Sequence, residues 1–183
     1  MLDFETDRLL VMQLPPERAN EVAAFHLANR EHLKERSPQR PEEFYTEEYW
    51  RRRLDQYIED AANDRSYSFF VAPKTSDEII GCVSYTNVVR GPFQACNLGY
   101  LVSRVHEGKG YTTEAVRRTI TFMFEEKNFH RISAGYMPDN FASGRVLEKL
   151  GFQKEGVAKE YLLLNGRWTD HILASLVNPH WKA

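Results

Sequence analysis

The stretch HEGKGYTTEA, residues 106–115, combines residue types that could bind an anion. Two glycines flank Lys109, and the pair Thr112-Thr113 follows at once. The first amides of a helix have no partner inside the helix, and the helix dipole is positive at that end. Glycine lets the backbone approach a ligand closely and adopt positive φ. If a helix starts here, the stretch predicts a cradle for a phosphate or diphosphate.

Two common nucleotide-binding motifs fit this stretch poorly. A Walker loop requires GxxxxGK followed by Ser or Thr, but Ser103 stands five residues before Gly108, and Gly110 follows the lysine. A Rossmann fingerprint requires a third glycine, and Thr113 occupies that position. Two interpretations stay open, a cradle for another kind of diphosphate and a solvated glycine turn.

The loop stands between predicted strands and a predicted helix. Residues 112–128 place apolar side chains on one helical face, among them Val116, Ile120 and Met123. Segments rich in β-branched and aromatic residues precede the loop, and we expect them to form antiparallel strands at 66–72, 78–89 and 95–103, with a turn at 90–93.

The other segments predict the elements that must position this loop. We expect a strand at 8–14, a helix at 15–33, a helix at 46–64 with Thr46 as N-cap, a strand at 131–137 and a helix at 140–152 before Gly151. Residues 159–177 predict two strands joined by a type I′ turn at Asn165-Gly166. This order predicts an α+β fold, with helices flanking one mixed, mostly antiparallel sheet.

The composition is that of a single globular domain over residues 1–183, with 42% hydrophobic and 27% charged residues. A net charge of −2 and a pI near 6.3 argue against direct DNA binding. Cys82 and Cys96 lack metal-ligand spacing, so we expect reduced thiols and no metal. No secretory signal or membrane-spanning run is visible, which predicts a cytoplasmic protein.

Motifs beyond the loop give the chain a family resemblance. The loop from Glu107 to Thr112 resembles the acyl-CoA motif Gln/Arg-x-x-Gly-x-Gly/Ala of the GNAT superfamily of N-acetyltransferases, with departures at its first and last positions. PDNFASGRVLEKLGF is similar to that family's second motif, N-x-x-S before a helix and LGF. Four further segments resemble its RimJ branch of ribosomal-protein alanine N-acetyltransferases, at residues 28–35, 87–100, 130–140 and 155–168.

The resemblance implies a GNAT fold with splayed central strands and direct transfer of acetyl from acetyl-CoA to a protein α-amine in a ternary complex. It implies cofactor contacts from Leu101, Val102, Glu107, Gly108, Lys109, Gly110, Tyr111, Thr112, Thr113, Asn140 and Ser143. The Ser143 hydroxyl would donate to the departing sulfur. Helix capping alone by Asn140 and a local hydrogen bond of Ser143 stay open as alternatives.

The general base is harder to assign. Many relatives carry a glutamate before the GY of the central strand, but this chain has Asn97 nearby and no acid. Glu160, on the strand that leads into the last hairpin, is the candidate base. An α-amine has a pKa of roughly 7.7–8.0 against about 10.4 for lysine, so a weak base suffices only for an α-amine. This favours an N-terminal acceptor.

Aromatic or polar residues near the expected sheet could line the acceptor site. The candidates are Asn87, Arg90, Tyr100, Tyr136 and Tyr161. Core packing of the aromatic residues and solvation of Arg90 are the alternatives, and His130 and His171 are expected only to pack. Expected partners are a ribosomal protein or the small ribosomal subunit, with a monomer or weak dimer as the working state. Two other functions stay open, transfer to a small-molecule amine and non-catalytic ribosome assembly with bound acetyl-CoA.

Overall fold

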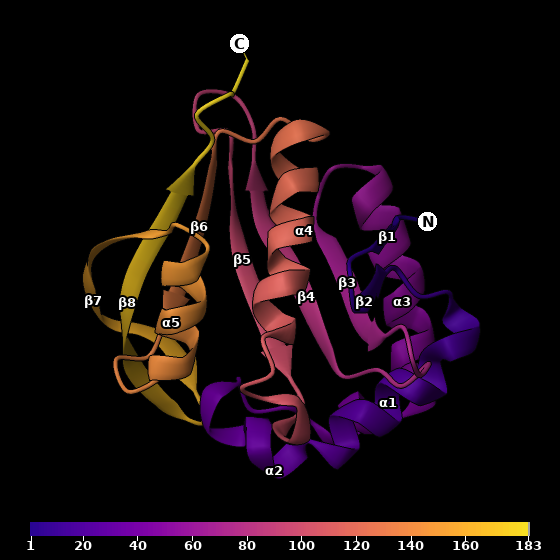
Figure 1. Ribbon diagram of the computed structural model, residues 1–183. Helices are drawn as coiled ribbons and strands as arrows, with labels where there is room; N and C mark the ends of the chain where they lie inside the picture. Colours follow the sequence, from indigo (N-terminus) through magenta and orange to yellow (C-terminus); the bar gives the residue numbers. More distant parts are fainter. Residues whose placement is uncertain (183) are drawn as a thin grey trace.

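The computed structural model describes residues 1–182, which build one eight-stranded sheet with helices on both faces (Figure 1). The strands lie in the order β1-β2-β3-β4-β5-β6-β8-β7. Strands β5 and β6 pair in parallel, and every other neighbouring pair in this sheet is antiparallel. The predicted α+β class with a mixed, mostly antiparallel sheet is therefore confirmed.

Apart from strand β1 and the division of the first helix, the elements follow the predicted order. The strands are β1 (Asp3–Glu5), β2 (Leu9–Met12), β3 (Tyr67–Pro73), β4 (Gly81–Val89), β5 (Ala95–Val102), β6 (Arg131–Tyr136), β7 (Gln153–Leu164) and β8 (Arg167–Val177). The helices are α1 (Ala19–Ala28), α2 (Arg30–Leu33), α3 (Glu47–Ala62), α4 (Tyr111–Glu125) and α5 (Phe141–Lys149). Short 3-10 turns lie at Pro16–Arg18, Lys34–Arg36, Glu42–Tyr45 and Arg104–His106.

Helices cover the two faces of the sheet separately. Helices α4 and α5 lie on the near face in Figure 1, and α1 and α3 lie on the other. Strand β3 is buried along its whole length, because its side chains enter both layers. Phe69 packs in the α4 layer, whereas Phe70 packs against α1 and α3. Two-sided burial agrees with the run of four apolar residues from Phe69 to Ala72.

The central strands separate halfway along their length. Strand β5 pairs with β6 only from Ala95 to Leu98, opposite Arg131 to Ala134. Beyond Leu98, the strand keeps its pairing with β4 alone. The two strands therefore diverge towards the loop that begins α4, which confirms the splayed centre (Figure 1).

Three local predictions need correction. Strand β1 was not predicted, because three residues are too short to show alternation. Strand β7 begins at Gln153 rather than at 159. The predicted helix at 15–33 is divided at Asn29, whose side-chain amide donates to Phe25 O at 2.9 Å. That bond competes with continuation of the helix.

Within residues 1–182, no helix combines the length and the apolar character needed to cross a membrane. The same residues contain no cluster of three or more histidine, cysteine or acidic side chains placed to hold a metal ion. Cys82 and Cys96 are free, and burial raises the pKa of each to about 12. Both cysteines are therefore protonated thiols at neutral pH.

Candidate functional site

A cavity of about 330 Å³ opens where β5 and β6 diverge. Its size is that of a small-molecule site. The cavity brings together residues that lie far apart in the sequence: Tyr100, Leu101, Val102, Glu107, Tyr136, Asn140 and Ser143 all line it, and so do His32 and His171. Seven residues that the sequence suggested for cofactor or acceptor binding therefore line the same cavity.

The loop before α4 presents free backbone amides. Gly108 and Gly110 have φ of 73° and 80°, the left-handed region that glycine adopts without strain. Gly110 is the N-cap of α4 and has no side-chain hydrogen bond, and the first helical bond runs from Glu114 N to Gly110 O at 3.1 Å. The amides of residues 111–113 thus precede the first helical bond and can bind an anion.

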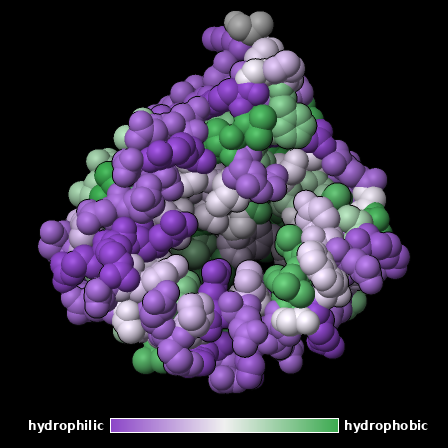
Figure 2. Space-filling view, turned by 180° about the vertical axis from the view of Figure 1, so that it is seen from behind, coloured by the Kyte–Doolittle hydropathy of each residue, from purple (hydrophilic) through white to green (hydrophobic). Residues whose placement is uncertain are grey.

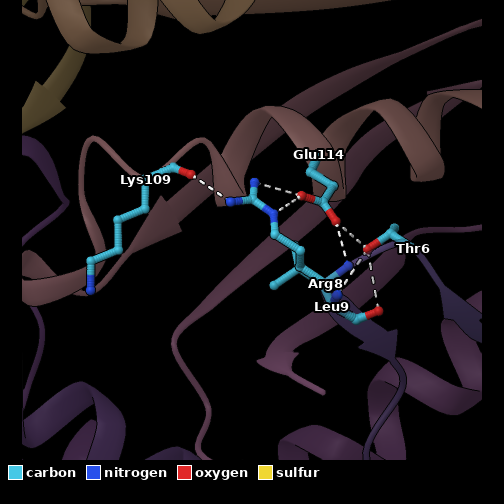
Figure 3. Close-up of polar contacts among 5 residues, drawn as sticks. All are labelled: Thr6, Arg8, Leu9, Lys109 and Glu114. Atoms are coloured by element: carbon cyan, nitrogen blue, oxygen red, sulfur yellow. Dashed lines mark hydrogen bonds and ion pairs between the residues drawn. The ribbon is translucent and has the colours of Figure 1, made fainter. Parts of the chain in front are cut away.

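An ion pair from the sheet edge holds this loop in place (Figure 3). Arg8, in the turn between β1 and β2, donates from Nε to Glu114 Oε2 at 2.7 Å and from Nη1 to Lys109 O at 3.0 Å. Thr6 Oγ1 and the Arg8 amide donate to Glu114 Oε1 at 2.6 and 2.9 Å. Burial alone would raise the pKa of Glu114, but these bonds outweigh it and hold the pKa below its ordinary value.

Glu107 also has a partner. Its Oε1 lies 3.3 Å from His32 Nε2, so the contact ties α2 to the loop. In the structure the carboxylate meets His32 at the cavity wall.

Ser143 forms a hydroxyl pair at the start of α5. Its Oγ lies 2.8 Å from the Tyr100 hydroxyl, and its amide donates to Asn140 Oδ1 at 3.2 Å. Asn140 is thus a true N-cap. Burial raises the pKa of Tyr100 to about 12, with a partly opposing effect of the bond to Ser143. The Tyr100–Ser143 pair therefore keeps its protons at neutral pH and can donate one.

His171 is a site residue that sequence reasoning missed. It is 3% exposed and lines the cavity from β8, and its Nδ1 lies 3.1 Å from Thr169 O. Because a carbonyl can only accept, Nδ1 carries the proton in this contact. That tautomer leaves Nε2 as a proton acceptor. A single strand histidine gave no sequence signal of this role.

Glu160 and Tyr161 lie in a bulge of β7. The β7–β8 register shifts between Ala158 and Leu162, and Glu160 has a φ of 46°. Its side chain is exposed and does not belong to the cavity lining, while its amide donates to Asp170 Oδ1 at 2.9 Å. Tyr161 is 41% exposed and packs beside the His171 ring at 5.7 Å. The bulge thus places Tyr161, but not the Glu160 carboxylate, next to the cavity histidine.

Arg90 and Asn87, which the sequence suggested for the acceptor site, do not line this cavity. Arg90 donates to both carboxylate oxygens of Asp64, at 2.6 and 2.8 Å, and its guanidinium lies 3.7 Å from the Phe129 ring centroid. This network lies at the β4–β5 turn, at the opposite end of β5 from the cavity. Asn87 is exposed in the β4 bulge beside the same turn. The Arg90 network therefore supports the hairpin.

Comparisons with known proteins agree with this geometry. Residues 8–153 match the family model of the acetyltransferase (GNAT) domain. The chain is 40% identical over 176 residues to the [Ribosomal protein uS5]-alanine N-acetyltransferase of Escherichia coli strain K12, covering 96% of this chain and 91% of the relative.

Two solved structures share the fold. Ribosomal-protein-S5-alanine acetyltransferase from Vibrio fischeri superposes with a TM-score of 0.96 at 42% identity, covering all of both chains. Mycobacterium smegmatis RimJ, solved in complex with CoA-disulfide, gives a TM-score of 0.85 at 26% identity, with 92% of this chain and 81% of that chain covered.

Proposed function

This chain belongs to the GNAT family of acetyltransferases, and from that premise we propose that it moves the acetyl group of acetyl-CoA to the N-terminal alanine amine of a ribosomal protein. The observation that supports this most is the meeting of a divergent β5 edge and a half-buried hydroxyl pair at one cavity. Glu107 also lines this cavity, and it begins the loop that carries the free amides. The acceptor class rests on the likeness to relatives named for uS5 or S5 alanine acetylation.

The residues present fit acetyl-CoA. The amides of residues 111–113 and the Lys109 backbone region would hold the diphosphate, because positive-φ glycines leave the approach to them open. Backbone groups of Leu101 and Val102, beyond the last β5–β6 pair, would bond the pantetheine arm. The bound cofactor supplies an activated acyl group as a thioester.

We expect Arg8→Gln to weaken CoA binding about fivefold, or about 1 kcal/mol, since the ion pair is half exposed. The change removes the bond to Lys109 O and the cation that neutralises the Glu114 carboxylate, and both effects oppose binding of the diphosphate. Calorimetric titration with CoA measures the effect. Lys74→Gln, which breaks the neighbouring pair with Glu5, is the control. Equal dissociation constants for CoA in Arg8→Gln and in the wild type would refute this role of the Arg8–Glu114 ion pair.

The Tyr100–Ser143 pair would protonate the leaving thiolate. A donor at the sulfur stabilises the departing thiolate, whose conjugate thiol has a pKa near the free-cysteine value of about 8.5. Ser143 and Tyr100 both line the cavity, and their hydroxyl oxygens lie 2.8 Å apart, so Tyr100 can supply a proton to Ser143. Ser143 therefore donates and Tyr100 replenishes the proton.

His171 would take the proton of the attacking amine. At pH 7, roughly a tenth of α-amines but only about one lysine amine in two thousand is neutral. His171 Nε2 is the free acceptor nitrogen of a ring in the cavity wall, held by the Thr169 carbonyl. Such a base assists an amine that is already partly neutral, so the arrangement favours an α-amine over lysine.

Peptide acetylation tests the proposal. We expect the protein to release free CoA from acetyl-CoA much faster with a peptide that starts with Ala than with an N-blocked peptide that contains one lysine. Both peptides are amidated at the C-terminus. Intact-mass analysis of ribosomal proteins incubated with this chain should show one protein gaining the mass of one acetyl group. A faster reaction of the lysine peptide, or of polyamines, would contradict the assignment.

A further inference from the structure

The loop that would take the CoA diphosphate begins with a negative charge. Glu107 immediately precedes Gly108 and stands three residues before Gly110, the N-cap of α4. It replaces the Gln or Arg that begins the GNAT loop motif. A carboxylate repels a diphosphate, and it can itself bind free amides at a helix N-terminus. A group that holds the Glu107 side chain away from these amides would therefore favour CoA binding.

His32 contacts this carboxylate at the cavity wall. Its Nε2 lies 3.3 Å from Glu107 Oε1, and both residues line the cavity between β5 and β6. The His32 side chain is only 19% exposed, so packing holds its ring in place. An imidazole donates from Nε2 when it is charged and also in one neutral tautomer. His32 can therefore hold the carboxylate in either state.

Helix α2, which carries His32, is attached to the segment before the loop (Figure 1). Asn29, directly before α2, accepts a hydrogen bond from the Arg104 amide through Oδ1 at 3.3 Å. Its Nδ2 donates to Phe25 O in α1 at 2.9 Å. These bonds fix α2 against residues 104–107, and they thereby fix His32 opposite Glu107.

The neighbouring cations do not share this contact. Lys34 pairs with Glu31 at 3.7 Å. Arg36 lines the cavity and Lys109 belongs to the loop, but neither pairs with an acid within residues 1–182. In this part of the chain, His32 is thus the one ionic partner of Glu107.

Glu107 has room to move if the contact with His32 is lost. Its side chain is 45% exposed and borders the cavity. The cavity opens on the face opposite α4 and α5, where Figure 2 shows the molecule hollowed at its centre. Without His32, the carboxylate could turn towards the loop amides, where it would compete with the diphosphate.

We propose that His32 is a positioning residue of the cofactor site: it holds the Glu107 carboxylate at the cavity wall and so keeps it away from the amides that take the CoA diphosphate. The inference rests on the proposed function, because it concerns the CoA site of that function. Its consequence is that His32 affects CoA binding only while residue 107 is acidic.

Paired substitutions test the inference. His32→Phe keeps a ring in the wall but removes the donor, and we expect it to weaken CoA binding about fivefold. Glu107→Gln, which removes the charge, should bind CoA at least as tightly as the wild type. In the Glu107→Gln background, His32→Phe should change the CoA affinity less than about twofold. Calorimetric titration with CoA at low ionic strength measures the wild type, both single variants and the double variant.

Two further measurements separate charge from structure. Salt at about 1 M should reduce the defect of His32→Phe, because screening weakens the repulsion between Glu107 and the diphosphate. Glu31→Gln, which removes a negative charge from α2 outside the loop contact, should keep the wild-type CoA affinity. An equal loss of affinity from His32→Phe in both backgrounds, or weaker CoA binding by Glu107→Gln, overturns the inference.

The titrations also separate this inference from the proposed function. If the wild type binds CoA and acetylates an Ala peptide, but His32→Phe binds CoA equally well, only the inference fails. If the wild type binds CoA but acetylates no amine, the proposed transfer fails, and the CoA affinities still decide the role of His32. Absence of CoA binding to the wild type refutes both.

Discussion

Ser143→Ala is expected to lower kcat for acetyl transfer about 10²- to 10³-fold while leaving CoA affinity nearly intact. The variant removes the hydroxyl that faces the cavity but keeps the backbone amide that donates to Asn140 Oδ1. The N-cap of α5 therefore survives, and the loss falls on protonation of the leaving thiolate. Single-turnover release of CoA, measured beside a calorimetric CoA titration, separates chemistry from binding.

Tyr100→Phe supplies the companion measurement. If Tyr100 acts through Ser143, its loss should slow transfer by a smaller factor, and the double variant should be little worse than Ser143→Ala alone. Thr121→Ala, on the exposed side of α4, is a control for loss of a hydroxyl outside the site. Wild-type kcat in Ser143→Ala would exclude the serine as proton donor.

His171→Gln is expected to reduce kcat/KM for an Ala peptide about 10²-fold at pH 7. The defect should shrink as pH rises above about 8, because the free α-amine then loses its proton without help. A pH profile of kcat/KM for the variant and the wild type measures this convergence. A structural role of His171 alone would lower the rate by a similar factor at every pH.

Glu160→Gln is the matched comparison, because the sequence favoured that residue as the base. Its carboxylate is exposed in the β7 bulge, outside the cavity lining, so we expect less than a threefold change at any pH. A large defect in Glu160→Gln at pH 7, together with a small one in His171→Gln, would return the role to Glu160.

Local signals predicted much of the fold. Thr46 accepts a bond from Tyr49 N and begins α3, as its position before two acids predicted. Asn165 and Gly166 both have positive φ and join β7 to β8. The loop at Gly108 and Gly110 has the backbone that its glycines predicted. These features depend on residues within a few positions of one another, so the local sequence is enough to predict them.

Tertiary structure decided which side chains meet. Arg90 was expected at the acceptor site, but the β4–β5 register carries it to the far end of β5 beside Asp64. His171 reaches the cavity through pairing of β8 with β6, and the stack of His26 on Trp50 joins α1 to α3. The sequence thus determined the elements, their caps and turns, and the family. Long-range strand pairing fixed the position of the proposed base, because such contacts leave no spacing pattern in a single chain.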